Sequence, residues 1–167
     1  MAVGYGAGAY FFNITTMAFE DTVPGTTAID GVALTNDART LAFNQAGTIL
    51  YAGGGGNVQL IEKVDAAYAV TTHHTTAAPR VWSLTTNAAD VLWFGSENGL
   101  YSFDGTTETK VPVVTTEVRT IVEIAGTAAK VVGDGETYTL NVTTGAITEQ
   151  SDLPTNSRMG HHAAWVK

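Results

Sequence analysis

Apolar and polar residues alternate along most of this chain in short segments, and turn residues separate these segments. The pattern is clearest in 40–44 (TLAFN), 81–85 (VWSLT) and 120–124 (TIVEI). A period close to two is typical of β-strands, whose successive side chains point to opposite faces of a sheet. Helical spacing is not sustained anywhere for long, so the pattern predicts an all-β fold.

The strand-like segments recur with a period of about 40 residues. Four arginines mark the repeat with spacings of 41, 39 and 39 residues: Arg39, Arg80, Arg119 and Arg158. After each of the first three, a first strand leads through a short turn to a second apolar run that ends in glycine, at Gly53, Gly95 and Gly133. A third strand is expected five residues after each glycine, and a fourth is expected at 68–72, 110–114 and 146–150.

Four strands in each period are typical of one blade of a β-propeller. The sequence therefore predicts a small propeller of four roughly 40-residue repeats that forms a single domain over residues 1–167. Blade 1 spans 38–79, blade 2 spans 80–118 and blade 3 spans 119–157. The fourth blade is split between the two ends of the chain, 158–167 plus 1–37, and we call it the split blade.

The two ends of the chain look like complementary halves of this split blade. Arg158 opens a first strand at the C-terminal end, and the N-terminal residues supply the later strands, the last of them near 29–34. Joining the halves covers sheet edges that an open array would expose. We favour closure of one chain on itself, because four is an established blade number. The alternative is a head-to-tail oligomer in which neighbouring copies exchange strands.

About eleven extra residues interrupt the split blade at roughly 14–24 (ITTMAFEDTVP). We interpret them as a loop insertion, and insertions in repeat proteins often lie on a binding face. Met17 and Phe19 are therefore candidate exposed anchors for a partner. The alternative is that both side chains pack against the edge of the blade.

Composition narrows the classes of partner. The 167 residues carry a formal net charge of −8 without any basic stripe, which argues against nucleic acid and anionic membranes. There is no cysteine, no apolar run of about 18 residues and no recognisable signal peptide, so the compartment stays open. Without that signal, we interpret the glycosylation triplets at Asn13 and Asn141 as accidental.

One segment within residues 91–105 carries a family resemblance. The sequence LWFGSENGLYSFDG resembles the repeat of two-component-regulator-type β-propellers, in which Trp-x-Gly-Thr-x-Asn-Gly-Leu-x-x-x-Asp-Gly recurs. The matching positions are Trp93, Gly95, Asn98, Gly99, Leu100, Asp104 and Gly105. In that family the repeats build large extracytoplasmic sensor propellers, so the resemblance implies the fold and leaves the role open.

The four repeated arginines are the best-defined polar feature. The first strand of each blade lies nearest the axis of a propeller, so these arginines could form a cationic ring at one mouth of the central channel. Such a ring could hold an anion or a carboxylate of a partner. The alternative is structural: each arginine could bond a carbonyl of the neighbouring blade or an acidic residue such as Asp37 or Glu117.

The sequence contains no recognisable catalytic or metal-binding motif. The glycine runs at 4–9 and 52–57 precede strands rather than helices, so we interpret them as turns and not as phosphate-binding loops. The pairs His73-His74 and His161-His162 lack the converging further ligands that zinc requires, and neighbours on a strand point to opposite faces. We therefore predict no catalytic residue, no metal and no cofactor.

These features favour a non-enzymatic structural or protein-interaction module. A small, acidic, threonine-rich β protein resembles in style the decoration, nozzle or fibre-associated subunits of phage virions. The predicted partners are other protein subunits, or further copies of the chain through strand exchange. The alternative is a lectin-like propeller that binds glycans or small molecules on Trp82, Trp93 or Trp165, unless these residues fill the spaces between blades.

Overall fold

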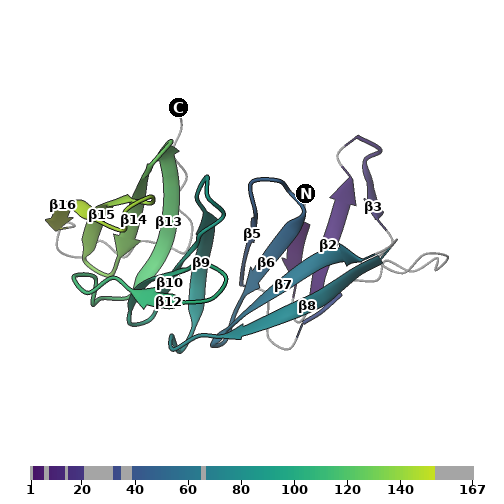
Figure 1. Cartoon of the computed structure of the whole chain (residues 1–167), viewed down its shortest axis with the longest axis horizontal. Helices are drawn as coiled ribbons and strands as arrows, with labels where there is room; N and C mark the ends of the chain where they lie inside the picture. Colours follow the sequence, from purple (N-terminus) through teal and green to yellow (C-terminus); the bar gives the residue numbers. More distant parts are fainter. Residues whose placement is uncertain are drawn as a thin grey trace.

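The computed structural model describes residues 2–5, 8–13, 15–20, 32–34, 39–64 and 67–152. All regular structure in these ranges is β-strand, and the strands form four antiparallel sheets of four strands each. Figure 1 shows the sheets side by side in an arc, with β16 at one end and β3 at the other. The prediction of an all-β fold is therefore confirmed.

Three of the sheets are meanders in which each strand pairs with the next. Blade 1 contains β5 (Thr40–Phe43), β6 (Ile49–Gly53), β7 (Asn57–Val64) and β8 (Ala67–Thr75). Blade 2 contains β9 (Val81–Thr86), β10 (Leu92–Ser96), β11 (Gly99–Phe103) and β12 (Glu108–Lys110). Blade 3 contains β13 (Val118–Ala125), β14 (Ala128–Gly133), β15 (Glu136–Asn141) and β16 (Ile147–Asp152). These strands lie within the predicted ranges, except that β13 begins one residue early.

The fourth strand of blade 2 differs from the prediction of 110–114. Strand β12 ends at Lys110, because Pro112 has no N–H to donate to a ladder and lies in the turn that follows. The N–H of Val111 still bonds the carbonyl of Leu100 at 2.9 Å, and that of Val114 then bonds the carbonyl of Val111 at 3.2 Å. This turn buries both valines in the core between blades 2 and 3.

The fourth sheet holds the N-terminal part of the split blade. It contains β1 (Ala2–Tyr5), β2 (Gly8–Asn13), β3 (Ala18–Glu20) and β4 (Val32–Ala33). Strand β4 pairs with the start of β2, which agrees with the strand expected near 29–34. Strand β3 pairs with the end of β2, so part of the predicted loop insertion forms a hairpin. Residues 158–167, the predicted first strand, lie outside the described residues, and closure of the ring stays a prediction.

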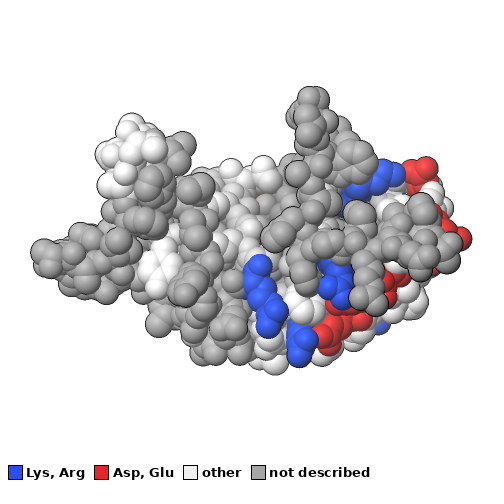
Figure 2. Space-filling model, turned by 180° about the vertical axis from the view of Figure 1, so that it is seen from behind, with Lys and Arg blue, Asp and Glu red and all other residues white. Residues whose placement is uncertain are grey.

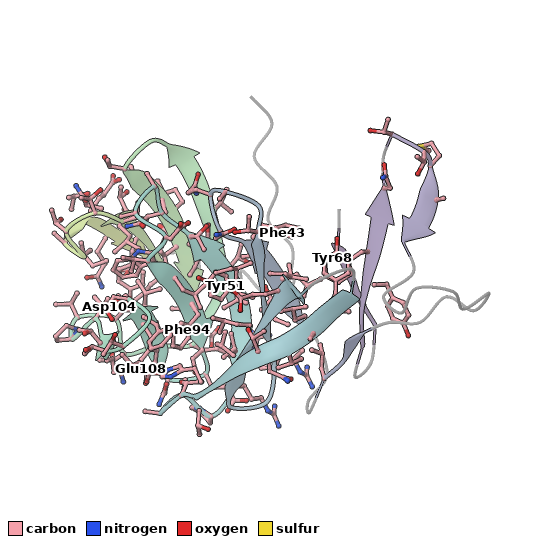
Figure 3. The ribbon with its side chains drawn as sticks, turned by 45° about the vertical axis from the view of Figure 1, so that its right-hand side comes forward. Phe43, Tyr51, Tyr68, Phe94, Asp104 and Glu108 are labelled. Carbon is pink, nitrogen blue, oxygen red and sulfur yellow. The ribbon has the colours of Figure 1, made fainter. Side chains whose placement is uncertain are left out.

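Apolar side chains fill the spaces between successive sheets. Ala9, Phe11 and Leu50 belong to the core between the split blade and blade 1. Tyr51 and Phe94 belong to the core between blades 1 and 2 and lie close together in Figure 3. A third core joins blades 2 and 3. Blades 1 and 2 thus bury apolar side chains on both faces, which explains their apolar strands.

A glycine at the end of the second strand permits close approach between blades. A Cβ atom on Gly53 would lie 2.7 Å from Cγ1 of Val81, and one on Gly95 would lie 2.5 Å from Cγ1 and 2.6 Å from the carbonyl oxygen of Val118. Both valines open the first strand of the next blade and are fully buried. Gly53 and Gly95 therefore mark the points where the first strands of blades 2 and 3 pack against the preceding blade.

Buried and partly buried hydrogen bonds join successive blades. The carbonyl of Val142 in blade 3 accepts from Nδ2 of Asn87 at 2.7 Å and from Nε1 of Trp93 at 3.1 Å, both in blade 2. The hydroxyl of Thr86 donates to the carbonyl of Phe43 in blade 1 at 2.7 Å. These polar groups between the sheets are thus satisfied across the blade boundary, which adds direction to the apolar packing.

A turn of four residues recurs at the ends of three third strands. Asn13, Asp104 and Asn141 each accept, through a side-chain oxygen, the N–H groups two and three residues later, at 2.7–3.1 Å. Both donors are threonines in all three copies, 13–16, 104–107 and 141–144. The amides of Thr107 and Thr106 lower the pKa of Asp104 below its ordinary value. The two apparent glycosylation triplets are therefore parts of this Asx turn.

We expect Gly95→Ala to lower the free energy of unfolding by about 2 kcal/mol, because the added methyl group would meet a backbone oxygen that cannot rotate away. Urea unfolding followed by tryptophan fluorescence measures the loss. Ser151→Thr adds a methyl group at an exposed position of β16 and should change stability by less than about 0.5 kcal/mol. An equally small change for Gly95→Ala would contradict the close approach of blades 2 and 3.

Candidate functional site

Three of the four predicted arginines converge on the indole of Trp82. Arg39 directly precedes β5, Arg80 directly precedes β9, and Arg119 is the second residue of β13. Their guanidinium carbons lie 5.1, 5.8 and 5.9 Å from the centre of the Trp82 ring, within the range of cation–π contacts. We call these four residues the arginine cluster. Arg158 lies outside the described residues.

Two β-bulges orient side chains into this cluster. In β9, Val81 pairs with Ser96 and Ser83 pairs with Gly95, so the ladder skips Trp82. In β13 the ladder likewise passes from Val118 to Thr120 and skips Arg119. A bulge breaks the alternation of a strand and re-aims its side chain. Trp82 and Arg119 can therefore meet beside the packed faces of blades 2 and 3 rather than within them.

Two carboxylates partly neutralise the cluster. Oε1 of Glu97, in the turn between β10 and β11, lies 2.9 Å from Nη1 of Arg80. Nη2 of Arg119 donates to Oε2 of Glu117 at 2.7 Å. Arg39 is exposed, and no described carboxylate forms an ion pair with it. Figure 2 shows one face of the molecule, on which blue and red side chains lie next to one another in the lower part.

Acidic and hydroxyl groups continue from the cluster along blade 3. Thr116, next to Glu117 in the sequence, lies 3.4 Å through its hydroxyl from Oε2 of Glu136. The hydroxyl of Tyr138 donates to the same carboxylate oxygen. Burial, and after it the hydrogen bond with Glu136, raises the pKa of Tyr138, so the phenol stays protonated and remains a donor. The surroundings of the cluster are therefore acidic.

The predicted apolar anchors lie on a different sheet from the arginine cluster. Met17 occupies the turn between β2 and β3 with a φ of 54°, and its side chain is 73% exposed. Phe19 lies in β3 opposite Phe12 in the register, and its side chain is outside the described part of the structure. Of the two, only Met17 is placed as an exposed apolar side chain.

The structure places Trp93 inside the core between blades 2 and 3, where it is only 4% exposed. A groove of about 270 Å³ runs beside it, and Val91, Lys110, Pro112 and Thr143 are among the residues that line it. Trp165 lies outside the described residues. Trp82 is therefore the one predicted aromatic platform that the described structure leaves partly accessible.

His74 joins blades 1 and 2. Its Nε2 lies 2.6 Å from Oε2 of Glu108, and its ring stacks on Phe103 with centroids 3.9 Å apart. The other oxygen of Glu108 accepts the N–H of Ala77 at 3.0 Å. Within the described ranges, no three histidine, aspartate or glutamate side chains lie close enough together to hold a metal ion. The same ranges contain no helix with the length and apolar character needed to cross a membrane.

Comparison with known proteins defines the fold. The sequence matches no known family and no curated protein. The structure is similar to one protein of the mitotic checkpoint complex, with a TM-score of 0.62, 16% identity, and coverage of 90% of this chain and 48% of that one. It is also similar to the β-propeller domain of Myceliophteria thermophila Cps50 (Swd1), with a TM-score of 0.67, 15% identity, and coverage of 92% and 51%.

A third similar structure is hydrazine synthase from Kuenenia stuttgartiensis, with a TM-score of 0.67, 11% identity, and coverage of 88% of this chain and 43% of that one. The protein therefore has a β-propeller fold and spans about half the length of these similar proteins. No family match supports the two-component-regulator type in particular.

The repeat pattern identifies the arginines, but it does not identify Trp82 as the residue that all three contact. Trp82 is expected from the sequence only as a stacking platform, although it stands two residues after Arg80. Glu97, the carboxylate partner of Arg80, is not among the predicted site residues. The sequence does point to Glu97 through its position in the turn after the repeated glycine. This turn lies at the same end of the sheet as the start of the first strand.

The arginines should contribute unequally to stability. Arg119→Ala removes a partly buried ion pair and a cation–π contact, and we expect it to cost about 1 kcal/mol of unfolding free energy. Arg39→Ala alters an exposed side chain and should cost less than about 0.5 kcal/mol. Urea unfolding of both variants measures the difference. Equal losses would show that Arg39 stabilises the fold as much as Arg119 does.

Proposed function

We propose that this protein is a non-enzymatic interaction module that binds a protein partner through the arginine cluster. The observation that carries the proposal is the convergence of Arg39, Arg80 and Arg119 from three blades on Trp82. Arginine and tryptophan are among the side chains most enriched at binding hot spots. One of the similar propellers belongs to the mitotic checkpoint complex, which supports a role in protein assembly.

The scaffold favours binding because the cluster stands on packed strands rather than on a long loop. Val81 and Val118, which are next to Trp82 and Arg119 in the sequence, are fully buried between blades. Backbone that is already ordered loses little entropy when a partner docks. Met17, on the hairpin of the split blade, offers an exposed apolar contact that a large partner could also use.

Two narrower forms of the proposal concern the partner. A virion subunit is supported only by the acidic, threonine-rich composition. A second copy of the protein is supported by the geometry. Nearly all of this chain aligns with only about half of longer propeller proteins, so its blades follow the curvature of a larger ring. Among the described strands only β2 pairs with β1, so the opposite edge of β1 is where 158–167 of a neighbouring copy would add.

The alternative is a propeller that binds glycans or small molecules, and its candidate site is the groove beside Trp93. The indole of Trp93 is almost fully buried, so it offers no open face for stacking on a sugar. Trp82, the partly accessible platform, is already faced by three guanidinium groups, so neither indole offers a free face, which favours the protein-interaction proposal. The resemblance of residues 92–105 to two-component-regulator repeats is a narrower proposal about ancestry, and it does not bear on this choice.

Reversing the charge of Arg39 should abolish partner capture. The wild-type protein, immobilised and exposed to lysate of its source cells, should retain a protein that mass spectrometry identifies, and Arg39→Glu should retain it at least about tenfold less. Lys110→Glu is the matched control, since Lys110 is also a cation over an aromatic ring, 5.7 Å from the centre of Tyr101. Equal retention by Arg39→Glu, or no retention by the wild type, would contradict the proposal.

Strand exchange predicts an oligomer. Native mass spectrometry of the purified protein should show complexes of two or more copies that dissociate on dilution. Deleting residues 158–167 removes the strand to be exchanged and should leave a monomer. A wild-type protein that is monomeric at every concentration would contradict exchange and support closure of the chain on itself.

A further inference from the structure

Among the described residues, the arginine cluster has one more guanidinium group than it has carboxylate partners. It contains three guanidinium groups, and described carboxylates pair with two of them, Glu97 with Arg80 and Glu117 with Arg119. The third, Arg39, forms no ion pair with a described carboxylate, and its guanidinium carbon is the nearest of the three to the Trp82 ring centre, at 5.1 Å. Within the described part of the chain, the excess charge of the cluster therefore lies at Arg39; Asp37, two positions earlier, is outside that part.

We propose that Arg39, held over Trp82, binds a single carboxylate of an extended acidic segment of the partner. This inference rests on the proposed function and names the chemistry that the same site recognises. A guanidinium over an aromatic ring keeps N–H donors at its edge, and a carboxylate can accept two of them side by side. The ligand group is an aspartate or glutamate side chain or the terminal carboxylate of a polypeptide.

The local charges select a carboxylate over a phosphate or a nucleic acid. A singly charged ligand neutralises the one excess charge, whereas a polyanion would also meet Glu97 and Glu117 nearby. The whole protein, at −8, adds to that repulsion. Nucleic-acid binding depends on several cations that contact successive phosphates, and two of the three arginines here already hold carboxylates.

Glu97 and Glu117 thereby act as internal competitors that limit affinity. The side chains of Arg80 and Glu97 are 52% and 36% exposed, and exposed ion pairs of this kind are weak and exchange easily. Replacing either glutamate by glutamine removes a competing carboxylate while it keeps the shape of the side chain. We expect each change to strengthen carboxylate binding and to weaken the discrimination against polyanions.

A peptide that carries one carboxylate tests the proposal directly. The probe is acetyl-Gly-Thr-Glu-Thr-Gly-amide, its twin with glutamine is the control, and the readout is the NMR shift of the Trp82 indole N–H. At low salt the glutamate peptide should bind with a dissociation constant on the order of 1 mM. Its glutamine twin should not bind measurably. Equal shifts from both peptides would overturn the proposal.

Four variants place the binding at the named residues. Arg39→Ala should weaken binding at least about tenfold, and Arg39→Lys should restore only part of it, because lysine lacks the planar fork. Glu97→Gln and Glu117→Gln should each strengthen binding about threefold. Lys110→Ala, the control, should bind like the wild type. Unchanged affinity in Arg39→Ala, or no gain in either glutamine variant, would overturn the assignment.

A hexathymidylate oligonucleotide, run in parallel, separates the carboxylate from a phosphate ligand. The wild-type protein should bind it more weakly than it binds the glutamate peptide, and the double variant Glu97→Gln/Glu117→Gln should reduce that difference. Tighter binding of the oligonucleotide by the wild type would overturn the carboxylate assignment. If Arg39→Glu no longer captures the protein partner but the glutamate peptide does not bind the wild-type protein, the proposed function is supported and the carboxylate inference is overturned.

Discussion

The structure depends on the contact between the first strand of one blade and the second strand of the blade before it. At this contact a valine side chain lies where a glycine has no side chain, Val81 against Gly53 and Val118 against Gly95. The small residue sets how closely two sheets approach, and the apolar cores between blades 1 and 2 and between blades 2 and 3 complete their packing around that distance. Because a Cβ atom on Gly95 would meet backbone in blade 3, the spacing of the blades has little tolerance.

This same contact assembles the arginine cluster. Trp82 directly follows Val81 and Arg119 directly follows Val118, so the residues that pack the blades are neighbours of the residues that form the site. The bulges then turn Trp82 and Arg119 away from the packed faces. The residues that pack the blades and the residues of the arginine cluster are thus adjacent along the sequence, and a change in blade spacing would move the guanidinium groups relative to the indole.

The sequence was sufficient to predict the propeller because periodicity of two, turns and glycines are local signals that repeat. The arginines were identified by the same period, and three of them do meet. The convergence of the arginines on Trp82 was not predictable. It depends on two register shifts of one residue and on contacts between blades that are some 40 residues apart. The fourth strand of blade 2 was predicted at 110–114 rather than at 108–110, because the apolar residues around Pro112 resemble a strand but turn into the core.

The Asx turns at residues 13–16, 104–107 and 141–144 have a consequence for how such a sequence diverges. Each turn is closed by hydrogen bonds between its own side chain and backbone, so its geometry does not require contacts with the cores. In all three copies the turn keeps an aspartate or asparagine and two threonines, whereas the core side chains differ from blade to blade. Local closure therefore lets the end of each of these strands keep its geometry while the apolar packing beside it varies.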